Sequence, residues 1–164
     1  MAADKPSIAA ATVDDVPVIF ALIRALADYE RLSHEVVATE ESLRQHLFGA
    51  KPAAEAILAR LEGQPIGFAL YFQTFSTFRG VPGLWLEDLF VLPDHRRHGI
   101  GKLLLREVAK IAHQRNCGRL EWSVLDWNEP AVNFYRKIGA AAMTDWTIQR
   151  FVGNEIQRLI ETLG

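Results

Sequence analysis

The sequence has few of the features that mark specialised classes of protein. Cys117 is the only cysteine among 164 residues, so an intramolecular disulfide is impossible, and a lone thiol is typical of a reducing compartment. No run approaches the roughly 18 apolar residues of a membrane span. Basic residues form no run either, and with 18 Lys and Arg against 20 Asp and Glu the formal net charge is -2. We therefore expect a protein that binds neither membranes nor nucleic acid.

The first residues also lack the pattern of a secretory leader. The chain begins Met-Ala-Ala-Asp-Lys-Pro, without a basic head followed by an apolar core. Hydrophobic residues make up 49% of the chain and charged residues 23%, a composition that is typical of globular proteins and too apolar for disorder. We expect a cytoplasmic protein with a single domain over residues 1–164.

Apolar periodicity and turn residues predict helices that punctuate a largely continuous sheet. The expected helices cover residues 13–30, 39–48, 99–116, 128–139 and 155–163. The expected strands cover residues 7–11, 56–60, 66–75, 84–91, 119–124 and 140–151. The first helix has a core-facing stripe of Ile19, Ile23 and Leu26, and an acid, Glu30, ends that stripe. This order of elements is typical of an α/β or α+β domain.

The junction after the most apolar strand reads Val91-Leu-Pro-Asp-His-Arg-Arg-His-Gly-Ile-Gly101. Gly99 and Gly101 allow the backbone to approach a ligand closely, and the N–H groups of the first helical turn would point at one spot. A helix start of this kind binds phosphate, and Arg96, Arg97 and Lys102 add positive charge. A glycine-rich helix start with solvated arginines is an equally good interpretation of this segment alone.

Two acids, Glu87 and Asp88, interrupt the same apolar strand. Charged side chains in a buried strand are costly unless they are paired or functional. Strand alternation places the two acids on opposite faces of the sheet, although a bulge would bring them closer, and bulges are common beside active sites. Asp88 is therefore either part of a site or one partner of a structural ion pair.

These motifs resemble those of the GCN5-related N-acetyltransferases. Arg96-x-x-Gly99-x-Gly101 matches the signature [QR]-x-x-G-x-[GA] of that family, and Asn128-Glu-Pro-Ala-Val-Asn-Phe-Tyr135 is similar to its second motif. The order of elements agrees from Ile8 to the C-terminal helix. Four shorter segments resemble one branch, the diamine (spermidine/spermine) N-acetyltransferases: Leu26-Ala-Asp-Tyr-Glu30, Gly67-Phe-Ala-Leu-Tyr71, Leu86-Glu-Asp-Leu-Phe-Val91 and Trp127-Asn-Glu-Pro130.

The resemblance implies an α/β (α+β) fold with a mixed sheet of about seven strands. The fourth and fifth strands, residues 84–91 and 119–124, are expected to splay apart and to admit acetyl-coenzyme A as co-substrate, with no metal ion. The residues that the resemblance assigns to the coenzyme are Leu89, Phe90, Val91, Arg96, Arg97, His98, Gly99, Ile100, Gly101, Lys102, Asn128, Glu129, Pro130 and Ala131. Proteins of this kind are commonly homodimers.

The resemblance also assigns roles in the chemistry. It implies that Tyr135 is the general acid that protonates the leaving thiolate, and that Glu87 is the base that acts through water on the acceptor ammonium. Tyr135 shares an inward helical stripe with Ala131, Phe134 and Ile138, so a core tyrosine is the alternative interpretation. The acceptor would contact Tyr29, Glu30, Glu87, Asp88, Glu121 and Trp122.

The resemblance therefore predicts an N-acetyltransferase that moves an acetyl group directly, in a ternary complex, to a primary amine of a small cationic acceptor. A polyamine, a diamine or a lysine-like amine would fit. His113 and Cys117 are spaced i, i+4, but two ligands without a third do not make a metal site. Two alternatives stay open: another acceptor, such as an amino acid, an antibiotic or a protein N-terminus, and a non-catalytic acyl-coenzyme A-binding module. The presence of both Glu87 and Tyr135 argues against the second alternative.

Overall fold

The computed structural model describes residues 5–164, which form two compact units, one up to Ser123 and one from Val124 to Gly164. Residues 1–4, part of the stretch in which we expect no leader, lie outside the described residues. The first unit is built on a five-stranded sheet in the order β1-β2-β3-β4-β5. Its strands are β1 (Ser7–Ala10), β2 (Glu55–Leu61), β3 (Gln64–Ser76), β4 (Val81–Val91) and β5 (Leu120–Glu121). The first four are antiparallel, whereas β4 and β5 run parallel, so the sheet is mixed.

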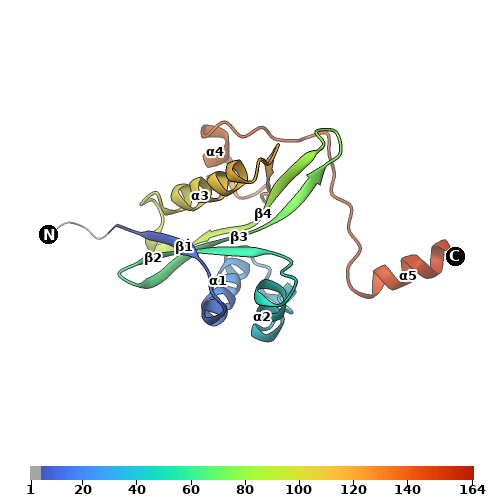
Figure 1. Ribbon diagram of the computed structural model, residues 1–164, viewed down its shortest axis with the longest axis horizontal. Helices are drawn as coiled ribbons and strands as arrows, with labels where there is room; N and C mark the ends of the chain where they lie inside the picture. The colour runs from blue at the N-terminus through green and yellow to red at the C-terminus, as the bar shows by residue number, and fades with distance from the viewer. Residues whose placement is uncertain (1–4) are drawn as a thin grey trace. The chain divides into compact units, whose positions relative to one another are not determined.

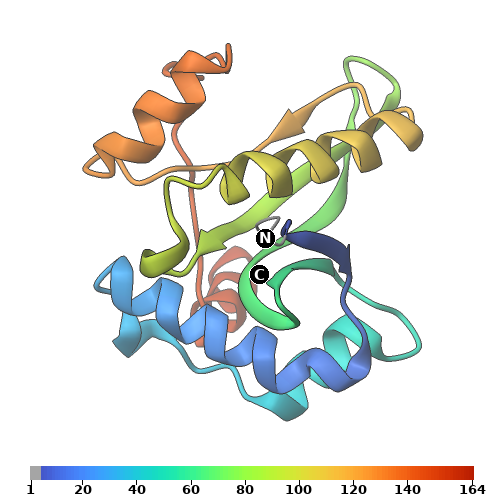
Figure 2. The same ribbon diagram turned by 90° about the vertical axis from the view of Figure 1, so that its left-hand side faces the viewer.

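Helices cover both faces of this sheet (Figures 1 and 2). Helices α1 (Val16–Tyr29) and α2 (Glu40–Phe48) lie on one face, and α3 (Ile100–Gln114) lies on the other. Three short 3-10 helices occupy the connections: η1 (Val13–Asp15), η2 (Ser33–Glu35) and η3 (Pro93–His95). The strands of the first unit therefore lie between two helical layers.

The helices form because their apolar residues recur at helical spacing and face the sheet. Helix α1 buries Ile19 and Leu22 against Phe68 and Phe90 of the sheet. Helix α3 buries Ile100, Leu104, Leu105, Val108 and Ala112 on its own side. The two helical layers thus hold β4 between them, and the candidate site residues of this strand lie in its C-terminal half, from Glu87 to Val91.

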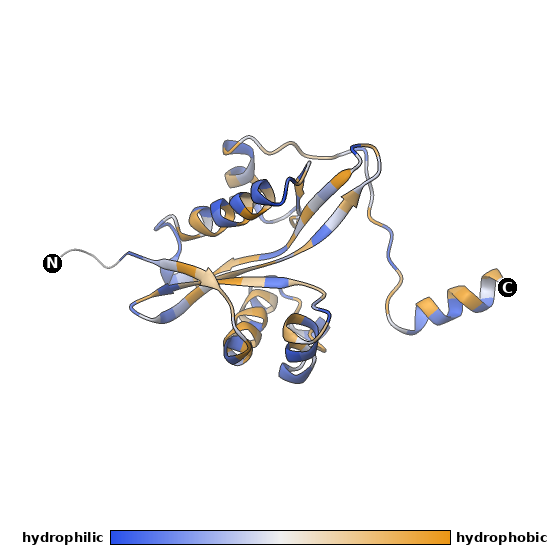
Figure 3. Cartoon of the chain, viewed as in Figure 1, coloured by the Kyte–Doolittle hydropathy of each residue, from blue (hydrophilic) through white to orange (hydrophobic). Residues whose placement is uncertain are grey.

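The second unit holds α4 (Glu129–Lys137) and α5 (Asn154–Leu163). Asn128 caps α4, because the Ala131 N–H donates to Asn128 Oδ1 at 3.4 Å. The Val152 N–H similarly donates to Glu155 Oε2 at 2.9 Å just before α5. Helix α5 has one apolar and one polar side (Figure 3), and none of its residues is buried.

The structure corrects several expectations. The described residues form five strands, not about seven. Residues 140–151 form no strand, because no strand of the described chain pairs with them and an extended segment needs a ladder partner. The expected strand 119–124 is paired over Leu120 and Glu121 alone. Ile138, expected on the inward stripe of α4, is 45% exposed because the helix ends at Lys137.

Most other element boundaries agree with the predictions to within a few residues. A tight turn at Glu62 and Gly63 joins β2 to β3, and φ values of 52° and 79° there suit the twist of a hairpin. Strand β4 begins at Val81, three residues before the start expected at residue 84. Within residues 5–164, no helix is long and apolar enough to span a membrane.

Candidate active site

Strand β4 contains one extra residue, Glu87, opposite the junction of Leu70 and Tyr71 in β3. Asp88 pairs with Leu70 and Leu86 pairs with Tyr71, so Glu87 has no register partner in β3 and forms a β-bulge. The extra residue interrupts the alternation of side chains along β4. Strict alternation therefore does not describe how the two neighbouring acids are oriented.

Trp85 shows to which face Glu87 turns. Trp85 pairs with Phe72 and Asp88 pairs with Leu70, and these two residues of β3 share one face of the sheet. The Trp85 Nε1–H donates to Glu87 Oε2 at 2.8 Å, so the Glu87 carboxylate lies on this face as well. Strict alternation, which would place Glu87 and Asp88 on opposite faces, therefore does not hold, and the bulge considered as the alternative brings the two acids to one face.

Trp85 was not among the site residues expected from the sequence. A signal for it was present, because residues i and i+2 of a strand share a face and Trp85 is two positions before Glu87. Its indole N–H occupies one oxygen of the Glu87 carboxylate. Trp85 therefore orients this carboxylate and leaves its other oxygen available to water or a ligand.

Glu30, which follows α1, forms an acidic cluster with Glu87 and Asp88. Burial raises the pKa of Asp88 to about 7, and the negative charges of Glu87 and Glu30 act in the same direction. Burial also raises the pKa of Glu30. Among the described residues, none of the three carboxyl groups takes part in a salt bridge, so the structural ion pair considered for Asp88 is not found. A cation placed here would offset this mutual repulsion.

The other expected acceptor contacts differ in their surroundings. Tyr29 ends α1 beside Glu30, and its ring centroid lies 6.4 Å from that of Phe90. Glu121 pairs in register with Trp85, but its Oε2 forms an ion pair with Arg119 Nε at 2.6 Å. The charge of Glu121 is therefore already balanced. Trp122 follows the last paired residue of β5 and is half-buried.

The loop between β4 and α3 presents backbone N–H groups. Arg97 and Gly99 have φ values of 67° and 78°, and left-handed residues in such a turn direct successive N–H groups toward one side, as in anion-binding nests. Helix α3 begins at Ile100 and has 15 residues, so its first N–H groups and its dipole also favour an anion. A Cβ added at Gly99 would meet nothing within 4 Å, and one at Gly101 would meet only the Val91 side chain, at 3.8 Å.

The side chains of this loop have separate surroundings. Arg97, His98 and Lys102 are exposed, so their charges or ring nitrogens can reach a ligand in solution. Ile100, the first residue of α3, has a buried side chain, so it can contribute only its backbone N–H. The loop therefore fits a phosphate-containing group, with the backbone providing most of the donors.

Strand β4 has an open edge next to this loop. Its pairing with β5 covers Leu84 and Trp85 alone, whereas its pairing with β3 continues to Val91. No strand of the described chain covers β4 from Leu86 to Val91 on the β5 side. Backbone groups of successive strand residues point to opposite edges, and the Leu92 N–H donates to the Ile66 carbonyl of the β3 side at 2.9 Å. By this alternation Leu89 faces the open edge, and its backbone groups can bind an extended ligand as an added strand would.

Arg96, the first residue of the glycine signature, makes its side-chain contacts with the sheet and with α1. Its Nε–H donates to the Val91 carbonyl oxygen at 2.9 Å. Its guanidinium carbon lies 4.2 Å from the ring centroid of Tyr29 and 5.4 Å from that of Phe90. The Arg96 charge therefore lies over two aromatic rings, next to the helix end that carries Glu30.

The remaining expected site residues belong to the second unit. Asn128, Glu129, Pro130 and Ala131 form the first turn of α4 and its cap. Tyr135 lies one helical turn beyond Ala131 and is half-buried, and burial raises its pKa to about 12. Its phenol is therefore protonated at neutral pH and can act as a donor.

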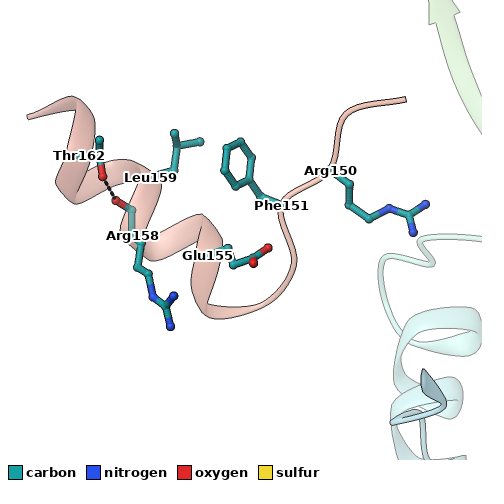
Figure 4. A pocket seen from close by; sticks show the side chains of 6 residues that line it. All are labelled: Arg150, Phe151, Glu155, Arg158, Leu159 and Thr162. Carbon is teal, nitrogen blue, oxygen red and sulfur yellow. Dashed lines mark hydrogen bonds between the residues drawn. The ribbon is translucent and has the colours of Figure 1, made fainter. Parts of the chain in front are cut away.

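The described chain holds no metal-binding cluster, and its second unit has one shallow hollow. Residues 5–164 contain no group of three or more His, Cys, Asp or Glu side chains that could hold a metal ion. Figure 4 shows a hollow of the second unit where Phe151 and Leu159 lie near one another while Arg158 extends away from them; its lining residues are Arg150, Phe151, Glu155, Arg158, Leu159 and Thr162. The one hydrogen bond drawn there joins the Thr162 hydroxyl to the Arg158 carbonyl at 2.8 Å, within the helix.

Comparison with known proteins supplies independent information. The model of the acetyltransferase (GNAT) family matches residues 21–140. The chain is 36% identical to thialysine N-epsilon-acetyltransferase of Mus musculus, in an alignment that covers 86% of this chain and 89% of that relative. It is 32% identical to L-ornithine N5-acetyltransferase NATA1 of Arabidopsis thaliana, in an alignment that covers 91% of this chain and 85% of that relative.

A solved structure agrees with these matches. An integron cassette protein from the mobile metagenome of V. cholerae superposes with a TM-score of 0.79 at 27% sequence identity, covering 95% of this chain and 98% of that one. The fold and these similarities define this protein as an acetyltransferase with an α/β fold. The chain belongs to the acetyltransferase (GNAT) family.

Proposed function

We propose that this acetyltransferase moves an acetyl group from acetyl-coenzyme A to a primary amine of a small cationic acceptor, by direct transfer in a ternary complex. The observation that carries the proposal is the acidic cluster. Glu30, Glu87 and Asp88 interact electrostatically on the α1 side of the sheet. The carboxyl end of β4, the strand that carries Glu87 and Asp88, leads to the loop that fits phosphate. A cationic amine would relieve the repulsion within the cluster.

The names of the two relatives support a lysine-like acceptor. Thialysine and L-ornithine, which those names give as substrates, are amino acids with an amine at the end of the side chain. An acceptor of this kind carries a positive charge at neutral pH, as do diamines and polyamines. We therefore include lysine-like amines, diamines and polyamines in the proposed acceptor class.

The residues of the first unit fit the coenzyme by their chemistry. The N–H groups around Gly99 and Gly101, with the exposed side chains of Arg97, His98 and Lys102, would hold the pyrophosphate. The open edge of β4 around Leu89 would hold the pantetheine arm, whose thioester supplies the acetyl group. Asn128 and the first turn of α4 would provide a second set of contacts. The open space at Gly99 supports this fit.

The proposed chemistry needs three proton transfers. Glu87, acting through water, takes a proton from the acceptor ammonium, because an ammonium has no lone pair for attack on the acetyl carbonyl. A C–N bond forms, the C–S bond breaks, and Tyr135 donates a proton to the departing sulfur. The second proton leaves the acceptor nitrogen as the amide forms, and it restores the phenol of Tyr135. The raised pKa of Tyr135, about 12, keeps the phenol protonated for this step. Holding both substrates together supplies much of the rate.

We also propose that residues 1–164 act as one acetyltransferase domain and that this domain forms a homodimer. The family match at residues 21–140 spans both compact units, which supports one functional domain. Trp146 is 74% exposed and Ile160 is 62% exposed, together with Met143, Ile148, Phe151, Val152, Ile156 and Leu163. Exposed apolar residues in this number are typical of an interaction surface. Sedimentation should show a dimer, weakened by Ile160→Glu; a wild-type monomer would contradict the proposal.

An acceptor screen tests the proposed function. The protein would be given acetyl-coenzyme A with spermidine, putrescine, lysine, ornithine, thialysine, neutral amines and peptides, and release of free thiol would be followed. We expect turnover with the cationic amines, and a lower rate with neutral amines. Glu30→Gln is the matched variant, and it should weaken binding of a long polyamine more than of a short monoamine. Thiol release with none of the amines would contradict the proposal.

Direct transfer has its own test. A two-step route needs an acetyl-enzyme, and Cys117 is the only thiol in the chain. Initial rates at varied concentrations of both substrates should give intersecting double-reciprocal lines, and Cys117→Ser should keep wild-type activity. Parallel lines, or loss of activity in Cys117→Ser with its stability unchanged, would contradict direct transfer.

A further inference from the structure

The Arg96 side chain joins three elements of the first unit. Its Nε–H holds the carbonyl at the end of β4 through Val91, at 2.9 Å. Its guanidinium lies 4.2 Å from the centroid of Tyr29, the last residue of α1, and 5.4 Å from that of Phe90. The backbone of Arg96 at the same time begins the turn that leads to the nest at Arg97 and Gly99.

These contacts place the guanidinium on the acceptor side of the site. Glu30 follows Tyr29 directly and caps α1, and Asp88 is two residues from Phe90. Whatever fixes the Tyr29 ring also fixes the helix end from which Glu30 extends. The Tyr29 and Phe90 rings are inclined by 50°, so a planar cation over both of them limits the rotation of Tyr29.

We propose that Arg96 is a positioning residue for the acceptor: its side chain clamps Tyr29, and through it the α1 end of the acidic cluster, instead of binding the pyrophosphate of the coenzyme. The inference rests on the proposed function, because it takes the acidic cluster as the acceptor site. It separates the two roles of the signature loop. The backbone of residues 97–101 serves the coenzyme, and the Arg96 side chain serves the acceptor.

The chemistry of arginine makes this role separable from phosphate binding. A guanidinium is planar and stacks on aromatic rings, whereas the ammonium of lysine is a compact point charge that still binds phosphate well. Arg96→Lys therefore keeps the charge but loses the stacking on Tyr29 and the Nε–H donated to Val91. A phosphate-binding role would tolerate this change, and a clamp would not.

The decisive measurement compares two affinities in Arg96→Lys. We expect the KM for the acceptor to rise about fivefold, which corresponds to a cation–π contact of about 1 kcal/mol, while the Kd of coenzyme A, measured by calorimetry without turnover, stays within about twofold. Arg106→Lys, at an exposed position of α3, is the matched control and should change neither constant. An unchanged acceptor KM, or a Kd for coenzyme A raised by about tenfold, would overturn the inference.

A double-mutant cycle tests the contact itself. Tyr29→Leu removes the ring that Arg96 contacts. In that background, Arg96→Lys should raise the acceptor KM by less than a further twofold, which is about the error with which the effects of independent mutations add. Full additivity of the two changes would overturn the clamp. If the wild-type protein acetylates no amine, the proposed function fails. The contact between Arg96 and Tyr29 can still be tested by the same double-mutant cycle, with the midpoint of urea unfolding as the measured quantity. Additive effects of Arg96→Lys and Tyr29→Leu on that midpoint would overturn the clamp.

Discussion

Glu87 and Asp88 are neighbours in a β-strand, and yet their carboxyl groups lie on the same face of the sheet. The bulge at Glu87 produces this arrangement, and the indole of Trp85 holds Glu87 on that face through a 2.8 Å hydrogen bond. Two carboxyl groups brought together in this way cannot both ionise at no cost. Burial and this repulsion together raise the pKa of Asp88, the less exposed of the two. Both the free energy of unfolding and the binding of a cationic acceptor should therefore depend on pH.

The free energy of unfolding should fall between pH 4 and pH 7 because of Asp88. Its pKa is raised from 3.8 to about 7 in the folded state, so over this interval the folded protein holds a proton that the unfolded chain has released. Stability from this group is complete below pH 3.8 and is lost as the pH rises through 7. Asp88→Asn removes the effect, and its stability relative to wild type should grow by about 1–3 kcal/mol from pH 4 to pH 8.

Urea unfolding of wild type and Asp88→Asn at several pH values measures this difference directly. Asparagine resembles the neutral carboxyl group in size and polarity, so the two proteins should have similar midpoints at pH 4 and should diverge above it. If the plots of unfolding free energy against pH for the two proteins remain parallel from pH 4 to pH 8, Asp88 is not the group that titrates in this interval.

Glu87→Gln should lower kcat/KM for a cationic acceptor by about 100-fold at neutral pH, the usual contribution of a general base. The amide oxygen still accepts the Trp85 N–H, so the fold and the Kd of coenzyme A should stay unchanged. Trp85→Phe is the matched variant, because it keeps the carboxylate but removes the hydrogen bond, and it should cost only a few-fold. Wild-type activity of Glu87→Gln together with an inactive Asp88→Asn would assign the base to Asp88.

The helices and the hairpin could be predicted because their signals are local. Helices were expected at residues 39–48, 99–116 and 128–139, and α2, α3 and α4 lie there. Thr39 and Asn128 cap two of these helices, and Ile100, Leu104 and Val108 form the buried face of the third, so the signals are all within a few turns. The strand expected at 140–151 was wrong for the opposite reason. A strand exists only where another strand pairs with it, and nothing in the local pattern reports whether a partner is present.

The bulge and the direction of Arg96 depend on contacts that are distant in sequence. Strict alternation follows from one strand, whereas the extra residue at Glu87 is defined by its register against Leu70 and Tyr71. The signature motif likewise indicates an anion site around Arg96. Where its side chain goes is decided by Tyr29, which precedes it by many residues. Motifs therefore locate the site, but tertiary contacts decide what each side chain does there.

Gly99→Glu should abolish binding of coenzyme A, since it adds both bulk and negative charge where the N–H groups of the nest converge. Glycine at this position has a φ of 78°, so any replacement also brings strain of about 1–2 kcal/mol. Gly99→Ala carries the same strain with little bulk and no charge, and it should bind coenzyme A much more tightly than Gly99→Glu. Calorimetric titration gives both constants, and equal affinities would remove the pyrophosphate from this loop.

Tyr135→Phe should lower kcat by about 100-fold while the Kd of coenzyme A stays within about twofold, because it removes a proton donor and leaves the ring in place. The raised pKa of Tyr135, about 12, adds a second expectation: in wild type, ionisation of this phenol should not reduce kcat as the pH rises from 7 to 10. Tyr71→Phe is the matched control, because Tyr71 is a buried tyrosine of β3 whose pKa is also raised, mainly by burial, and this change should leave kcat near wild type. Equal kcat values for Tyr135→Phe and wild type would show that another group, or water, protonates the leaving sulfur.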